Sequence, residues 1–146
     1  CYIFNRAVID SIPKGVVTSV ERETFPSLIA HNRRIVGYKE NAYWLDIGNP
    51  GALFKGSQDL VAVDFLISPS AEVDATAVLA GGTSIGAGAQ IGAGAILDNC
   101  IVSAHAIVKP GAHLTRTFLA PAAVVEEGAS YTDRYISQSE NLPIIF

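Results

Sequence analysis

Several things are scarce in this 146-residue sequence: it has no methionine, one tryptophan and two cysteines, Cys1 and Cys100. Two cysteines cannot form a disulfide framework, and they predict reduced thiols, as in the cytoplasm. No apolar run approaches the roughly 18–20 residues that cross a bilayer, so we expect no membrane partner. Because a translated chain starts with methionine and this one starts at Cys1, we expect these residues to be part of a longer polypeptide.

Positive charge is scarce after residue 57. Residues 58–146 carry three Lys/Arg against nine Asp/Glu, whereas residues 1–57 carry seven against five. The second part is therefore acidic, with no basic patch for nucleic acid. The slightly basic first part is compatible with a phosphorylated substrate.

A short internal repeat organises the second part. Residues 85–95 read IGAGAQIGAGA, and the six-residue period extends in both directions. Each hexad opens with an apolar or aromatic residue, and the hexads group into triplets spaced by 18, 17 and 17 residues. The twelve openers are Ile67, Val73, Leu79, Ile85, Ile91, Leu97, Val102, Val108, Leu114, Leu119, Val125 and Tyr131.

A second column follows the openers four residues later. It is alanine after the first two openers of every triplet and larger after the third, as Thr83, Ile101, Phe118 and Tyr135. We interpret each hexad as a short strand plus a turn, with the opener and this fourth residue both pointing into a three-sided tube. Glycines such as Gly86, Gly88, Gly92 and Gly94 would permit the turn dihedrals. The pattern predicts an all-β parallel helix of about four coils over residues 67–135.

These repeats resemble the hexapeptide-repeat family of left-handed parallel β-helices, whose motif is [LIV]-G-x-G-A-x. The left hand is implied by that resemblance alone, because parallel crossovers are generally right-handed. After Tyr135 the pattern fades, and we expect a polar partial coil between Ile136 and Leu142. Residues 144–146 would then fold back or dock on a neighbour.

The first 62 residues alternate predicted strands and helices. We expect strands at residues 2–4, 34–38 and 42–47, and helices at 6–12 (capped by Asn5), 19–24, 26–30 and 50–61. Thr18 and Glu21 have the spacing of a capping box. These elements are too few to close an α/β sheet, so we interpret them as an α/β fragment that residues before Cys1 would complete.

The most informative motif reads YWLDIGNP, at residues 43–50. Asp46 closes an apolar strand beside Gly48 and a helix N-terminus, where α/β proteins commonly hold phosphates and metals. Asp46 is therefore a candidate Mg²⁺ ligand, since Mg²⁺ takes one or two carboxylates plus substrate phosphates. The residues leave open the alternative that Asp46 only accepts a hydrogen bond from the following turn.

Three segments resemble the C-terminal part of the catalytic domain of sugar-1-phosphate nucleotidyltransferases, also called NDP-sugar pyrophosphorylases. The mannose-1-phosphate guanylyltransferase-like branch and the glucose-1-phosphate thymidylyl- or adenylyltransferase-like branches share this order of segments, so the nucleotide and the sugar stay open. The segments read YIFNRAVIDSIPKG, TSVERETFPSLI and GYKENAYWLDIGNP. The resemblance implies a Rossmann-like domain portion at residues 1–62, a β-helix at 63–135 and a cap or tail at 136–146. It implies that Asp46 binds the catalytic Mg²⁺, that Glu21 binds the sugar and that Gly48 keeps the turn open beside the metal. For Trp44 it favours packing.

The resemblance also implies a reaction: a nucleotidyl group passes from an NTP to a sugar 1-phosphate with release of pyrophosphate. The family's Gly-rich loop with its Arg and Lys does not occur in these residues. We therefore expect the parent enzyme to be active and the 146 residues alone to be inactive, with the β-helix serving assembly or regulation and forming a homo-oligomer.

Two alternatives come from the repeats alone. Hexapeptide-repeat acyltransferases use a histidine near a loop that interrupts the coils, and here His105 and His113 lie within an uninterrupted register. A purely structural oligomerisation module is the other alternative. We do not expect a zinc site, because the spacing of these histidines does not match the three-histidine pattern of γ-type carbonic anhydrases.

Overall fold

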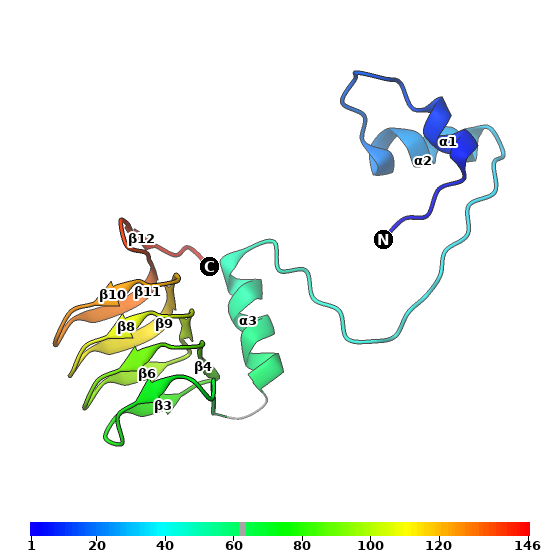
Figure 1. Cartoon of the computed structure of the whole chain (residues 1–146). Coiled ribbons are helices and arrows are strands. Elements are labelled where there is room, and N and C mark those ends of the chain that lie inside the picture. Colours follow the sequence, from blue (N-terminus) through cyan, green and yellow to red (C-terminus); the bar gives the residue numbers. More distant parts are fainter. Residues whose placement is uncertain (62–63) are drawn as a thin grey trace. The chain divides into compact units, whose positions relative to one another are not determined.

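The computed structural model describes residues 1–61 and 64–146, and its contacts divide the chain into two compact units, Cys1–Tyr43 and Trp44–Phe146. Each unit is described by itself (Figure 1). The predicted domain boundary between residues 62 and 63 falls outside the described residues.

The first unit is helical. Helix α1 (Arg6–Ser11) begins after Asn5, whose side chain accepts a hydrogen bond from the Ala7 amide at 3.1 Å. A π-helical turn, η1 (Val20–Thr24), continues directly into α2 (Phe25–Ala30), which has a proline in its first turn. The predicted helices and the predicted Asn5 cap are confirmed.

The predicted capping box is displaced by one residue. Ser19, not Thr18, caps η1: its Oγ accepts from the Arg22 amide at 3.2 Å, and its own amide donates to Glu23 Oε1 at 3.0 Å. The Thr18 hydroxyl donates to the Val16 carbonyl instead. Serine is the stronger N-cap, and Glu23, four residues after Ser19, takes the role that the three-residue spacing assigned to Glu21.

The three predicted strands of the first 62 residues are wrong as strands, since residues 2–4, 34–38 and 42–47 make no ladder within the described chain. A strand needs a hydrogen-bonding partner, and no neighbouring strand stands beside these segments. Tyr2 and Phe4 pack on Phe25 of α2 instead, with ring centroids 5.1 and 5.9 Å from it. Aromatic contact takes the place of strand pairing there.

The second unit is a parallel β-solenoid with one helix against it, α3 (Pro50–Val61), whose bounds match the prediction. Successive coils stack as parallel strands, as Figure 1 shows. The strands are β1 (Phe65–Ile67), β2 (Glu72–Val73), β3 (Val78–Ala80), β4 (Thr83–Ile85), β5 (Gln90–Ile91), β6 (Ile96–Asp98), β7 (Ile101–Val102), β8 (Ile107–Val108), β9 (His113–Leu119), β10 (Val124–Val125), β11 (Ser130–Ile136) and β12 (Asn141–Pro143).

The predicted opener columns are confirmed. Ile67 pairs with Ile85, Ile85 with Val102, and Val102 with Leu119, each directly above the last. The second and third openers of each triplet stack in the same way along the other two faces. Openers of the middle coils are at most 3% exposed, whereas those of the first coil are half-buried. The core is therefore one continuous column of side chains inside the tube.

At the third corner of the later coils, which follows the third opener of a triplet, the structure differs from the prediction. Ile101, Phe118 and Tyr135 were expected inside, but the buried residues there are Cys100 and Thr117, one position earlier, at 0% exposure. Side chains alternate across a strand, so the residue lost from each 17-residue circuit reverses the side that the fourth residue faces. Burial raises the pKa of the Cys100 thiol to about 12, which leaves it unreactive.

The corner glycines serve two purposes. Gly94, with φ +65°, has the left-handed conformation that the pattern predicted. Gly92 has no positive φ: a Cβ there would lie 2.6 Å from the Pro110 nitrogen in the coil above, and Gly86 is crowded in the same way by Ala104. At these two positions glycine is required by the close approach of backbones from adjacent coils, not by its dihedrals.

The solenoid ends in a hairpin, so the predicted polar partial coil is wrong. Ile136 continues the first opener column above Leu119 and is 5% exposed. The chain then reverses, and β12 pairs antiparallel with β11, setting Leu142 opposite Tyr135. Residues 144–146 fold back on this unit, as the sequence allowed, with the Ile144 amide donating to the Asp133 carbonyl at 2.8 Å.

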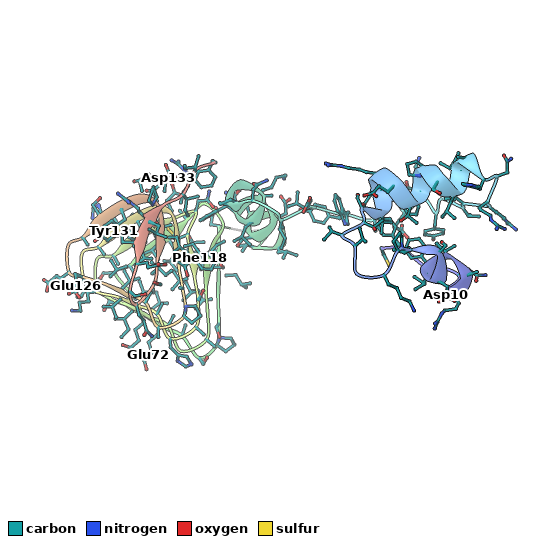
Figure 2. The ribbon with its side chains drawn as sticks, turned by 90° about the horizontal axis from the view of Figure 1, so that it is seen from above. Asp10, Glu72, Phe118, Glu126, Tyr131 and Asp133 are labelled. Atoms are coloured by element: carbon teal, nitrogen blue, oxygen red, sulfur yellow. The ribbon has the colours of Figure 1, made fainter. Side chains whose placement is uncertain are left out.

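Helix α3 lies against the solenoid face on which a second column of paired side chains points outward. The rings of its last two members stack with centroids 5.6 Å apart. The members of this column are Leu66, Ser84, Ile101, Phe118 and Tyr135. Figure 2 shows Phe118 on the side of the coils that faces α3.

None of the helices in the described ranges has the length and apolar character needed to span a bilayer.

Two neighbouring valines test the inward and outward alternation. Val125 is 1% exposed and Val124 is 43% exposed on the same strand, β10. We expect Val125→Ala to lower the free energy of unfolding by about 1.5–3 kcal/mol, through lost burial and a residual cavity. Val124→Ala should change it by about 0.5 kcal/mol or less. Urea unfolding measures both, and equal effects would contradict the solenoid register.

Candidate functional site

The site predicted around Asp46 lies in the segment that leads into α3. The Asp46 side chain is exposed, and its Oδ1 accepts a hydrogen bond from the Gly48 amide at 3.1 Å. A Cβ added to Gly48 would lie 3.3 Å from the same oxygen, so a side chain there would crowd the carboxylate. The structure thus brings Asp46 and Gly48 together in a tight turn.

The turn is fixed to the helix that follows it. Asn49 Oδ1 accepts from the Ala52 amide at 2.9 Å, and the Asn49 carbonyl accepts from the Leu53 amide. This is the cap expected of asparagine before a proline at the first helical position. Leu45 and Ile47 lie on either side of Asp46 in sequence and both approach Gly56 of α3. Alternate residues therefore pack on the helix while the carboxylate points to solvent.

The burial of Trp44 is lower than a packing role predicts. The resemblance favoured a packing role, but 80% of its surface is exposed in the described chain. Ile47 nearby is 59% exposed. An apolar surface therefore borders the exposed carboxylate of Asp46.

Glu21 belongs to the first unit. Its Oε1 accepts a hydrogen bond from the Tyr2 hydroxyl at 2.8 Å, and its Oε2 accepts from Ser19 Oγ. These bonds, chiefly the one from Tyr2, lower the pKa of the Glu21 carboxyl, and the same bond raises the pKa of Tyr2. Glu21 is thus held as an exposed, ionised acceptor. No sequence pattern predicted that Tyr2 would be its hydrogen-bond partner.

The side chains near Asp46 decide whether it could hold the implied Mg²⁺ without further ligands. Among residues 1–61 and 64–146, no group of three or more His, Cys, Asp or Glu side chains could hold a metal. A single exposed carboxylate fits Mg²⁺ only as one ligand among several, the others being water, phosphate oxygens or another carboxylate. Asp46 therefore fits the role that the resemblance implies but does not form a metal site with its described neighbours.

An apolar groove of about 630 Å³ lies next to the Asp46 turn, and sequence reasoning missed it. It runs between the start of α3 and the last coils of the solenoid. The large residues at the third corner could have indicated this groove, because Phe118 and Tyr135 line it. Its lining residues are Ile47, Gly48, Asn49, Pro50, Leu53, Phe54, Phe118, Tyr135, Leu142, Pro143, Ile144 and Ile145.

The two histidines of the solenoid lie in its regular coils. His105 is exposed at a corner with φ +60°, and its ring lies over Gly88 of the coil below. His113 is exposed at the start of β9, beside Ile96 of the coil below. Neither residue stands on a loop that leaves the solenoid.

Comparison with known proteins gives a consistent result. The chain is 40% identical over 129 residues to a mannose-1-phosphate guanylyltransferase of Mycobacterium tuberculosis, a match that takes in 80% of this chain and 36% of that protein. It is 39% and 38% identical over 56 residues to mannose-1-phosphate guanyltransferases of Debaryomyces hansenii and Candida albicans, covering 38% of this chain and 15% of each yeast protein. No protein-family model matches the chain.

The matches differ in how much of each protein they cover. The chain spans about a third, or less, of the length of these relatives. The bacterial match, at 80% of the chain, is longer than the second unit of 103 residues, so it necessarily includes residues of the helical first unit. The likeness is therefore not confined to the repeats and α3.

Proposed function

Since 80% of this chain matches a mannose-1-phosphate guanylyltransferase of Mycobacterium tuberculosis, we propose that it forms part of an enzyme that makes an NDP-sugar. In that reaction a phosphate oxygen of the sugar 1-phosphate attacks the α-phosphorus of the NTP, and pyrophosphate leaves. The names of the relatives favour GTP and mannose 1-phosphate as substrates. The observation that carries the proposal is the bacterial match, which covers 80% of this chain and extends beyond the second unit.

Asp46 is proposed as the Mg²⁺ ligand contributed by this chain. Its exposed carboxylate is oriented by the Gly48 amide through Oδ1, and the cap at Asn49 fixes the following turn. Mg²⁺ would neutralise charge that develops on the phosphates. The other oxygen, Oδ2, is the one that the Gly48 amide does not contact, and we propose it for the metal.

Glu21 is proposed to bind the sugar. A carboxylate accepts hydrogen bonds from sugar hydroxyls, and Glu21 is kept ionised by the bond that Tyr2 donates. Tyr2 would then act by orienting Glu21. The enzyme is proposed to work in the cytoplasm, where its substrates would be made.

Replacing Asp46 tests the metal role in the whole enzyme. We expect Asp46→Asn to lower kcat for pyrophosphate release by about 100-fold or more, because the amide keeps the shape of the carboxylate but loses its charge. The measurement is pyrophosphate release as Mg²⁺ is varied. Glu40→Gln, which changes another exposed carboxylate that accepts backbone hydrogen bonds, is the matched control. Unchanged kcat and Mg²⁺ dependence in Asp46→Asn would rule out the assignment.

The 146 residues by themselves are expected to release no pyrophosphate above background. Phosphoryl transfer depends on cationic groups arranged around the phosphates, and the Gly-rich loop with Arg and Lys that does this in the family does not occur in the sequence. The assay supplies GTP, mannose 1-phosphate and Mg²⁺, with the whole enzyme as positive control. Turnover by the purified 146 residues would refute this part of the proposal.

The solenoid is proposed to serve assembly of the enzyme into a homo-oligomer. Val78 and Ile96 pair on adjacent coils, face outward, and are 52% and 41% exposed. Two adjacent exposed aliphatic side chains on a rigid face suit a symmetric contact between copies. A regulatory role would use the same rigid surface.

Light scattering on the 146 residues measures this assembly. We expect a mass of at least twice 15.4 kDa, because the contact lies on the solenoid. The double variant Val78→Lys with Ile96→Lys should return the mass to that of a monomer, since two buried lysines would repel across a symmetric interface. Gln90→Lys, on a different face, should leave the mass unchanged. A monomeric starting chain would overturn the proposed assembly.

A further inference from the structure

Residues 144–146 form a short tail that crosses from the last coil of the solenoid to α3. Its start is fixed by β12 and by the Ile144 amide, which donates to the Asp133 carbonyl at 2.8 Å. Phe146 lies against the first turns of α3 with one part of its ring, while 58% of its surface stays exposed. In Figure 1 the red tail ends beside the cyan end of α3, where the helix begins.

Phe146 packs on the face that α3 turns toward the tail. Its ring centroid is 5.6 Å from that of Phe54, which is 3% exposed, and the rings meet edge to face at 63°. A Cβ on Gly51 would lie 3.3 Å from Phe146 Cδ1. Gly51 has no positive φ, so the missing side chain makes room for the ring. Glycine is a poor choice inside a helix unless something needs that space.

The Phe146 ring also lies near one side chain of the solenoid. The Arg116 guanidinium carbon lies 5.9 Å from the ring centroid, within the range of a cation–π contact. Arg116 is held by two hydrogen bonds to Asp133 of the next coil, Nε to Oδ1 at 2.6 Å and Nη2 to Oδ2 at 2.8 Å. Both residues occupy corner positions with positive φ, and Figure 2 shows Asp133 at a corner of the coils. A bidentate pair between two coils gives the ring a fixed support.

The helix that Phe146 contacts begins directly after the Asp46 turn. Asn49 joins the turn to the helix through its hydrogen bond to the Ala52 amide. Ile47 and Gly48 line the same groove as Ile144 and Ile145. The position of the Asp46 carboxylate relative to the solenoid therefore depends on how the tail holds the start of α3.

We propose that Phe146, supported by Arg116 and Asp133, is a positioning residue that fixes the start of α3 and thereby the Asp46 carboxylate. The proposal rests on the proposed function insofar as Asp46 is the metal ligand. Phe146 itself touches neither metal nor substrate. A tail that only stabilised the solenoid would hold the last coils together without affecting the order of residues 44–49.

The single tryptophan provides a readout that needs neither metal nor activity. Trp44 lies two residues before Asp46, and it is 80% exposed. In the 146 residues we expect Phe146→Ala to lower the steady-state fluorescence anisotropy of Trp44, because the segment gains freedom. Phe146→Tyr keeps the ring and should restore the wild-type value. Phe65→Ala, at a half-exposed phenylalanine of the first coil, is the matched control and should leave the anisotropy unchanged.

A second variant guards against loss of folding. Gly51→Leu introduces a good helix former but places its side chain where the Phe146 ring lies, so α3 is retained while the contact is lost. It should lower Trp44 anisotropy as Phe146→Ala does, with circular dichroism unchanged. Unchanged anisotropy in this folded variant would overturn the proposal, whatever Phe146→Ala shows.

The whole enzyme then tests the consequence for the metal. We expect Phe146→Ala to raise the Mg²⁺ concentration for half-maximal activity about five-fold, with KM for the sugar phosphate unchanged. A fall in kcat at all Mg²⁺ concentrations without that shift would overturn the positioning role. If Asp46→Asn is fully active, the proposed metal role fails, while the anisotropy measurements still decide whether Phe146 orders the Asp46 segment.

Discussion

The stacking of one apolar opener directly above another is the interaction on which the rest of the structure depends. No single coil can bury Ile85 or Val102 alone, because β4 and β7 are only three and two residues long and alternate residues face the tube. Burial comes from the coils above and below, so the core is a column and its ends are its weakest parts. That column fixes the register of every strand, and with it the side of the sheet on which each remaining residue lies.

The register explains how a repetitive solenoid acquires one special face. In the 17-residue circuits the small residues Cys100 and Thr117 fill the tube, and Phe118 and Tyr135 turn outward into an apolar stripe. Helix α3 and residues 144 and 145 flank that stripe and leave the apolar groove between them. The same helix begins at the Asp46 turn, so the solenoid and the candidate site are connected through α3.

The candidate site itself is incomplete by its own chemistry. Asp46 is one exposed carboxylate, and Glu21, in the other unit, is held ionised by Tyr2. Both are groups that bind and orient, and neither is surrounded by the cationic side chains that phosphoryl transfer requires. The match to the bacterial mannose-1-phosphate guanylyltransferase, which extends beyond the second unit, supports the proposal that this chain supplies part of a catalytic centre.

The sequence alone determined the features that depend on local chemistry and period: the opener columns through Ile85 and Leu119, helix α3 after Asn49, and the exposed carboxylate of Asp46 as a candidate ligand. Tertiary structure decided the rest. Whether Thr117 or Phe118 lies inside depends on how a shortened corner turns, which a repeat length does not specify. Strands at residues 34–38 and 42–47 need a partner that sequence pattern cannot supply, and the reversal after Ile136 depends on Leu142 finding Tyr135 across a hairpin. Pairing, sidedness and the contact of Phe146 with α3 are all interactions between residues distant in the chain, and their geometry exists only once the coils have stacked.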